Sequence, residues 1–102
     1  MPFYLLQVSY TPGAWKRMHD DPNLAMCYKT IQPAVTRNGG KLHNAWLSFG
    51  EYDSVCIVEV ADNKTAATVS IELSAGGLFG SVKTTPLIPV DDGRDALSKA
   101  KI

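Results

Sequence analysis

The sequence predicts an α+β fold in which four antiparallel strands form one sheet and the helices lie on one face of it. Three observations predict this fold. A strand, a tight turn and a second strand run from residue 46 to residue 60, with Gly50-Glu51-Tyr52-Asp53 as the turn. Further strand patterns open the chain and follow the glycine pair at residues 76–77. Between the strands lie two stretches whose apolar residues recur with helical spacing.

The first strand is predicted over residues 3–10, which are aromatic and apolar and stop at Thr11-Pro12-Gly13. Successive side chains of a strand point to opposite faces, so the two faces of this strand differ. One face carries Tyr4, Leu6, Val8 and Tyr10, and the other carries Phe3, Leu5, Gln7 and Ser9.

The first helical region is predicted over residues 12–38, with a break at His19-Asp20-Asp21-Pro22. Thr11 is placed to cap its first segment, and Asp21 is placed to cap a second segment that begins at the following proline. Pro33 falls within this second segment and is expected to kink the helix or to end it early. The apolar residues of the second segment predict one buried face made of Leu24, Cys27, Tyr28, Ile31 and Val35.

The rest of the chain supplies the hairpin, one helix and a last strand. Lys41 to Phe49 is the predicted second strand, and Ser54 to Val60 is the third. Asp62 is a natural N-cap for a helix over residues 63–75, which the glycine pair ends. The fourth strand runs from Phe79 to about Thr85.

The predicted order is therefore β-α-β-β-α-β, the split βαβ or ferredoxin-like arrangement. Right-handed crossovers place both helices on one face of the antiparallel sheet. Because a large apolar sheet face is seldom left in water, we expect a second copy of the chain to cover the other face. Residues 1–102 are expected to form one domain, with residues 91–102 as a short polar helix or a frayed tail. The apolar residues expected on the bare face are Leu5, Leu42, Trp46, Val55 and Ile57.

Composition limits the classes of partner. Of the 102 residues, 45% are hydrophobic and 20% are charged, which is typical of a soluble globular protein. Ten Lys and Arg balance ten Asp and Glu, so no net charge draws the chain to nucleic acid or to an anionic membrane. No run is long enough to span a membrane, and the first residues lack the features of a signal peptide. We therefore expect a cytoplasmic protein with no nucleic-acid or membrane partner.

The hairpin Phe49-Gly50-Glu51-Tyr52-Asp53, followed by an apolar strand, resembles the GYD-domain family. This family consists of small bacterial and archaeal proteins of the dimeric α+β barrel superfamily, and it has no settled biochemical role. The resemblance implies a ferredoxin-like fold that pairs into a dimeric α+β barrel. The break at Asp20-Asp21-Pro22 and Pro33 depart from the regular first helix expected of the family. The likeness covers most of residues 3–85 and also includes Phe3-Tyr4-Leu5-Leu6, Gly39-Gly40-Lys41-Leu42, Asp62 and Gly80-Ser81-Val82-Lys83-Thr84.

A small-molecule site is predicted on the bare face of the sheet. If Trp46 faces that side, the period of a strand places Asn44 and Ser48 beside it. Apolar walls with a few polar groups are typical of ligand pockets. A semi-polar dimer interface with bound water explains the same residues equally well. The predicted ligand-binding residues are Trp46, Asn44, Gln7, Lys83 and Tyr52.

The sequence also contains four candidate catalytic residues, namely Tyr52, Asp53, His43 and Glu59. Asp53 can act as an acid or base, but a turn aspartate more often bonds to the backbone. Tyr52 either positions a ligand or packs at the end of the sheet. His43 lies on a strand, and Glu59 lies on the next; a histidine facing a cavity can be a general base or a haem ligand. His19 and its two aspartates are contiguous in a loop and seldom close a coordination shell, so we expect no metal and no other cofactor.

Three functional hypotheses follow from these residues and from the resemblance. The first is a small homo-oligomeric protein that binds a small apolar or aromatic molecule between its sheets. The second is a cofactor-independent enzyme of the monooxygenase or isomerase kind. The third is a sensory or assembly module without catalysis. A shared fold does not by itself transfer chemistry, so the site has to decide among them.

Overall fold

The computed structural model describes residues 1–23 and 25–102, and its strands form one antiparallel sheet in the order β2-β3-β1-β4. This arrangement confirms the ferredoxin-like α+β fold. In chain order the elements are β1 (Phe3–Tyr10), α1 (Pro12–Asp20), the π-helical turn η1 (Cys27–Ile31), α2 (Gln32–Arg37), β2 (Lys41–Leu47), β3 (Ser54–Glu59), α3 (Asn63–Ala75), β4 (Phe79–Leu87) and α4 (Val90–Lys99).

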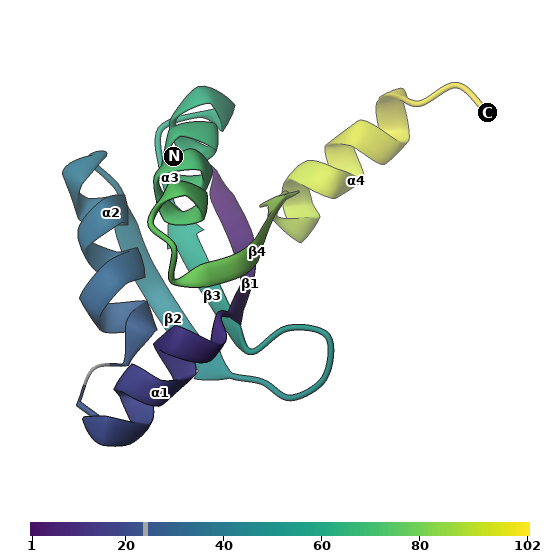
Figure 1. Cartoon of the computed structure of the whole chain (residues 1–102). Coiled ribbons are helices and arrows are strands. Elements are labelled where there is room, and N and C mark those ends of the chain that lie inside the picture. The colour runs from purple at the N-terminus through teal and green to yellow at the C-terminus, as the bar shows by residue number, and fades with distance from the viewer. Residues whose placement is uncertain (24) are drawn as a thin grey trace.

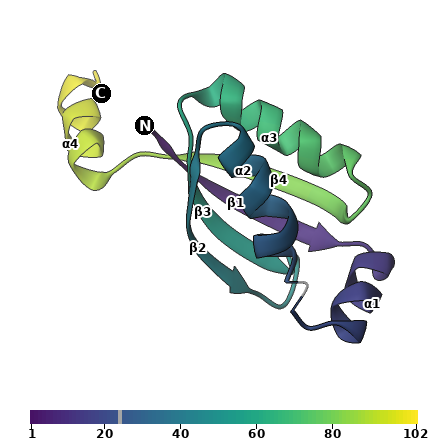
Figure 2. The same ribbon diagram turned by 90° about the vertical axis from the view of Figure 1, so that its left-hand side faces the viewer.

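The sheet is covered on one face only within the described chain. Helices α2 and α3 lie across that face, α1 lies at the end where β1 stops, and α4 lies beyond the opposite end (Figures 1 and 2). Burial alternates strictly along β1 and β3, which gives each of these strands one buried face. The core lies between this face and the helices and comprises Tyr4, Leu6, Val8, Tyr10, Ala14, Met26, Cys27, Ile31, Ala34, Val35, Leu42, Cys56, Val58, Val60, Ala66, Val69, Leu73 and Phe79.

Two of the three predicted helix caps, Thr11 and Asp62, are present. The Thr11 Oγ1 atom accepts a hydrogen bond from the backbone N–H of Ala14 at 3.2 Å, at the start of α1. The Asp62 carboxylate accepts one from the backbone N–H of Thr65 at 2.8 Å, and α3 has the bounds predicted for it. This hydrogen bonding also lowers the pKa of Asp62, first through the Thr65 hydroxyl and then through the Thr65 N–H.

The second helical segment begins later than predicted. The Asp21 carboxylate accepts a hydrogen bond from the backbone N–H of Asn23, two residues further on, at 3.1 Å. This is the hydrogen bond of an Asx turn, and it does not cap a helix. The helix then starts near Met26, so the predicted start at Pro22 is wrong. Leu24, which was expected on its buried face, lies outside the described residues.

A π turn carries this helix past Pro33. The backbone N–H of Gln32 bonds to the carbonyl of Cys27, five residues back, and α2 then continues to Arg37. Pro33, which lacks an N–H, therefore stands in the first turn of α2 and does not end the helix. The wide turn also changes the helical phase, so Tyr28 is 55% exposed, contrary to the predicted buried face.

A β-bulge at His43 decides which face each residue of β2 occupies. Leu42 pairs with Val58, and Asn44 pairs with Ile57, so His43 is the extra residue between them. Leu42 consequently packs under the helices and is 9% exposed, and its predicted position on the bare face is wrong. Strand β2 also ends at Leu47, earlier than predicted.

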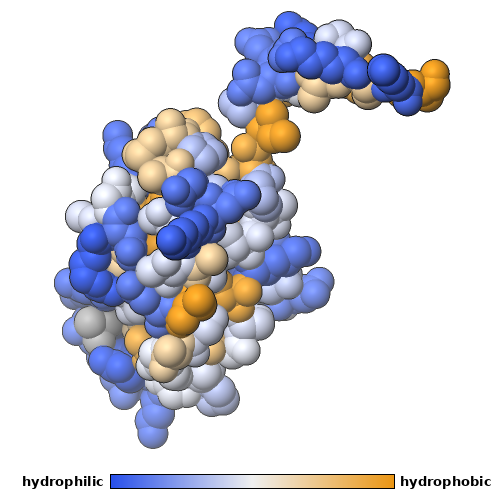
Figure 3. All heavy atoms as spheres, turned by 90° about the horizontal axis from the view of Figure 1, so that it is seen from above, coloured by the Kyte–Doolittle hydropathy of each residue, from blue (hydrophilic) through white to orange (hydrophobic). Residues whose placement is uncertain are grey.

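Helix α4 stands away from the rest of the molecule. It forms a largely hydrophilic lobe joined to the body by an apolar neck (Figure 3), and Ile88 and Val90 in this region are 69% and 74% exposed. The molecule is elongated as a result, with principal extents of 53 × 29 × 20 Å. Among the described residues, no helix combines the length and apolar character needed to cross a membrane.

Candidate functional site

An apolar pocket of about 280 Å³ lies where α1, η1 and the edge strand β2 meet. Four aromatic residues line it, together with Met18 and Cys27, and the other lining residues are Pro, Ala and Leu. None of these lining residues is charged. We call it the aromatic pocket after Tyr10, Trp15, Tyr28 and Trp46.

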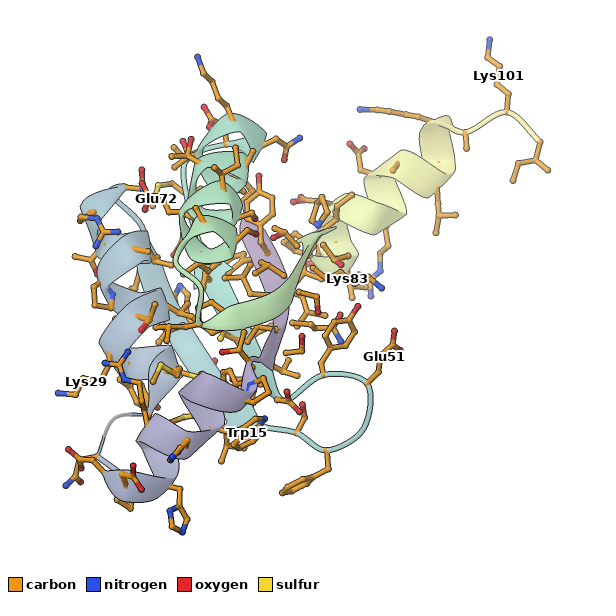
Figure 4. All side chains as sticks on the ribbon, viewed as in Figure 1. Trp15, Lys29, Glu51, Glu72, Lys83 and Lys101 are labelled. Carbon is orange, nitrogen blue, oxygen red and sulfur yellow. The ribbon has the colours of Figure 1, made fainter. Side chains whose placement is uncertain are left out.

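Aromatic contacts fix the inner wall of this pocket. Tyr10 meets Trp15 edge to face, with ring centroids 4.9 Å apart and an interplanar angle of 79°. Trp15 lies where α1 meets one end of the sheet (Figure 4). Tyr10 is buried, whereas Trp15 and Trp46 are 41% and 54% exposed. The pocket therefore has a buried aromatic floor and an exposed aromatic rim.

A cluster of hydroxyl and thiol groups adjoins the pocket at Tyr10 and Cys27. The Cys27 Sγ atom is 2.7 Å from the Ser54 Oγ atom and 3.9 Å from the Tyr10 hydroxyl oxygen. Ser54 also donates to the backbone carbonyl of Trp46 at 3.2 Å. Ser54 is fully buried because it is the first inward-facing residue of β3, and Cys27 faces it from the first turn of η1.

These contacts distinguish the two cysteines. Hydrogen bonding from the Cys56 thiol, followed by the hydroxyls of Ser54 and Tyr10, lowers the pKa of Cys27 to about 6 against the opposing effect of burial. The pKa of Cys56 rises because its thiol bonds to Cys27 and because it is buried. Burial also raises the pKa of Tyr10. Cys27 is therefore the group that ionises, while its two neighbours keep their protons and act as donors.

The helix-free face of the sheet, which we call the open face, carries most of the predicted ligand residues. Neighbouring strands place Lys83, Gln7, Val55 and Trp46 in one row of paired residues. The next row consists of Thr85, Leu5, Ile57 and Asn44. Lys83 extends from β4 on the side away from α2 (Figure 4). Gln7, Asn44, Trp46 and Lys83 thus share one face, and of these only Trp46 also borders the aromatic pocket.

His43 and Glu59 are brought together at one end of the open face. The His43 Nε2 atom is 2.8 Å from the Glu59 Oε1 atom, and their side chains are 28% and 22% exposed. The ring of Phe3 packs 5.2 Å from the imidazole, centroid to centroid. The N-terminal amine of Met1 lies 3.9 Å from the other carboxylate oxygen of Glu59. The bulge at His43 contributes to this pairing, since it adds a residue to β2 opposite the end of β3.

Asp53 and Tyr52 hold the loop between β2 and β3 in place. The Asp53 carboxylate accepts a hydrogen bond from the backbone N–H of Tyr10, and the Asp53 N–H donates to the carbonyl of Val8, both at 2.8 Å. The carbonyl of Tyr52 accepts from the Ser48 hydroxyl at 2.7 Å. Neither Asp53 nor Tyr52 lines the aromatic pocket. Both of these hydrogen bonds of Asp53 join the loop to the backbone of β1, so its carboxylate bonds to the backbone, as one of the two alternatives drawn from the sequence expected, but with a distant strand as its partner.

Sequence reasoning missed most of the aromatic pocket. Trp15 and Met18 are three residues apart on α1, which is the spacing of one helical face directly after the buried Tyr10. That spacing predicts that Trp15 and Met18 lie together beside the end of the first strand, where the pocket is found. No local signal places Cys27 against Ser54, which is 27 residues further along the chain.

Comparisons with known proteins agree with the fold. The model of the GYD domain matches residues 4–97. The crystal structure of FFRP-DM1 is 16% identical with a TM-score of 0.56, and the match covers 86% of this chain and 100% of that one. The crystal structure of hypothetical protein PHS023 from Pyrococcus horikoshii is 15% identical with a TM-score of 0.53, covering 87% of this chain and 92% of that one. No curated protein matches the sequence.

Proposed function

The chain belongs to the GYD-domain family, and from this premise we propose that it is a homo-oligomeric protein that binds a small, neutral aromatic molecule in the aromatic pocket. The observation that carries the proposal is the pocket itself: about 280 Å³ lined by four aromatic residues and by no Lys, Arg, His, Asp or Glu. A pocket of this size holds a molecule built on one aromatic ring. Rings prefer edge-to-face or offset contacts with each other, which these walls offer.

A second copy of the chain is proposed to cover the open face. Leu5, Val55 and Ile57 form its centre and are partly exposed in the single chain. Burial of such a face supplies about 25 cal/mol for each Å² removed from water. Because Trp46 belongs both to the open face and to the pocket rim, the same contact would complete the outer wall of the pocket. Light scattering after size exclusion tests this part, and a monomer at micromolar concentration contradicts it.

Binding is tested with benzylacetone, a neutral aromatic ketone, followed by tryptophan fluorescence. Saturable quenching is expected because both tryptophans of the protein border the pocket. Phenylacetate should bind more weakly, since no cationic side chain lines the pocket to compensate for desolvating its carboxylate. Tyr28→Ala should weaken benzylacetone binding, whereas Ile71→Ala, an exposed change on α3, should not. The absence of saturable quenching by benzylacetone would refute the proposal.

A second candidate function rests on the His43–Glu59 pair. The 2.8 Å contact lets Glu59 orient the imidazole, so that His43 can take a proton from a substrate held over the open face. This is the arrangement expected of a cofactor-independent enzyme of the isomerase or monooxygenase kind. Exchange of carbon-bound hydrogen for deuterium in a carbonyl probe would report it, and His43→Gln should abolish that exchange. A packed interface with neither exchange nor ligand binding would instead favour a sensory or assembly module.

A further inference from the structure

We propose that Cys27 is a nucleophile that forms a covalent bond with aromatic α,β-unsaturated carbonyl compounds bound in the aromatic pocket. This inference rests on the proposed function, because it uses the same pocket. It adds to that function a covalent reaction at the Cys27 Sγ atom, and it names the α,β-unsaturated carbonyl compounds as the class of ligand.

The position of Cys27 supports this role. Cys27 lines the pocket and is 5% exposed, whereas Cys56 is fully buried and does not line it. Of the two cysteines, Cys27 is therefore the one that borders a ligand in the pocket. The surrounding walls are aromatic and uncharged, so they favour a neutral ring over an anion.

The neighbours of Cys27 are those that a thiolate needs. Ser54 from β3 and Tyr10 from β1 place hydroxyl groups 2.7 Å and 3.9 Å from the sulfur. The Tyr10 hydroxyl can donate to a thiolate, and the Ser54 hydroxyl can do so by turning its one hydrogen from the carbonyl of Trp46 to the sulfur. The titratable groups beside Cys27 are Tyr10 and Cys56, and the pKa of each is raised. Both therefore remain protonated when Cys27 ionises, and its pKa of about 6 makes the thiolate its main form at neutral pH.

The reaction is an addition that balances without an oxidant. The thiol proton leaves to solvent, and the sulfur lone pair forms a bond to the β-carbon of the unsaturated carbonyl. The π electrons of the carbon–carbon double bond form a new double bond between the α-carbon and the carbonyl carbon, and the carbonyl π electrons move to oxygen and give an enolate. The Tyr10 hydroxyl, which lies 3.9 Å from the sulfur, is positioned to donate to a nearby developing negative charge. Water then protonates the α-carbon, and the product is a thioether.

The experiment uses benzylideneacetone as the reactive probe and benzylacetone as its saturated, unreactive counterpart. The intact protein is incubated with the reactive probe, weighed by mass spectrometry and mapped by proteolysis. One added probe molecule is expected on Cys27, formed before any adduct is detected on Cys56. Cys27→Ser should abolish the adduct, and Cys56→Ser should retain it. An excess of benzylacetone should slow labelling of the unmodified protein, a readout that does not depend on either variant folding.

The outcomes separate this inference from the proposed function. If benzylacetone binds but benzylideneacetone leaves Cys27 unmodified, the nucleophile assignment is wrong and the binding proposal stands. If benzylacetone does not bind, both are wrong. Labelling of Cys56 before Cys27, or labelling of Cys27 that benzylacetone does not slow, also overturns the inference, because the reaction would then not depend on the pocket.

Discussion

The carboxylate of Asp53 accepts a hydrogen bond from the backbone N–H of Tyr10 at 2.8 Å, across 43 residues of sequence. Tyr10 is the last residue of β1, and its side chain forms the floor of the aromatic pocket. The loop between β2 and β3 therefore fixes the end of the strand that supports the pocket. This contact links the turn at residues 50–53 to the site that we propose.

Asp53→Ala should destabilise the protein by about 1–3 kcal/mol, because a partly buried N–H of Tyr10 loses its acceptor. Chemical denaturation followed by circular dichroism measures this change. Asp53→Asn is the matched control, since its amide oxygen keeps an acceptor in the same place. Equal stability of the Ala and Asn variants would show that the hydrogen bond contributes little.

Gly40→Ala should also destabilise the fold, by about 1–3 kcal/mol. A Cβ atom at Gly40 would lie 2.5 Å from the Glu59 carbonyl oxygen and 2.6 Å from a methyl carbon of Val60. The end of β3 must therefore move to admit it. Gly93→Ala is the control, because a Cβ there meets nothing within 4 Å and alanine favours the helix α4. If the Gly40→Ala variant melts at the same temperature as the wild type, the close approach of Gly40 to the end of β3 is contradicted.

Periodicity and turn residues were sufficient to predict the fold. Asp62 and the glycine pair at residues 76–77 bracket α3 with the bounds that were predicted, because capping and termination are local interactions. The π turn at residues 27–31 and the bulge at His43 were not predictable in this way. Each adds one residue to a regular element. In the sequence such an addition looks the same as any other irregularity in the spacing of apolar residues, so it cannot be located in advance.

The candidate site was less predictable than the fold for a related reason. The sequence pointed to Trp46, since a tryptophan on a strand is large and chemically distinct. It did not point to Cys27, whose lowered pKa comes from Tyr10 on β1 and from Ser54 and Cys56 on β3. Those contacts depend on the register of β1 with β3, which only the folded sheet establishes.

The labelling rate of Cys27 should rise with pH around its pKa of about 6 and then level off. The sign follows from the thiolate being the reactive form: a lowered pKa lets the reaction begin at lower pH than in an ordinary thiol. Iodoacetamide labelling with quantitative peptide mapping measures the profile. The denatured protein serves as the reference, and its profile should be centred near an unperturbed pKa of about 8.5. Coinciding native and denatured profiles would show that Tyr10, Ser54 and Cys56 do not perturb Cys27.

Trp46→Ala tests whether assembly and binding share one residue. In the single chain Trp46 is 54% exposed and pairs with Val55 on the open face, so its loss should alter the unfolding of an isolated protomer only slightly. If a second sheet and a ligand cover it, the same change should cost the assembled form about 3–5 kcal/mol, the range for truncating a fully packed aromatic side chain. Sedimentation across a dilution series and benzylacetone titration measure the two effects. Ile71→Ala removes a similarly exposed apolar side chain from α3 and should change neither. An unchanged oligomer with weakened binding would place Trp46 in the pocket alone, and an unchanged oligomer with unchanged binding would exclude it from both.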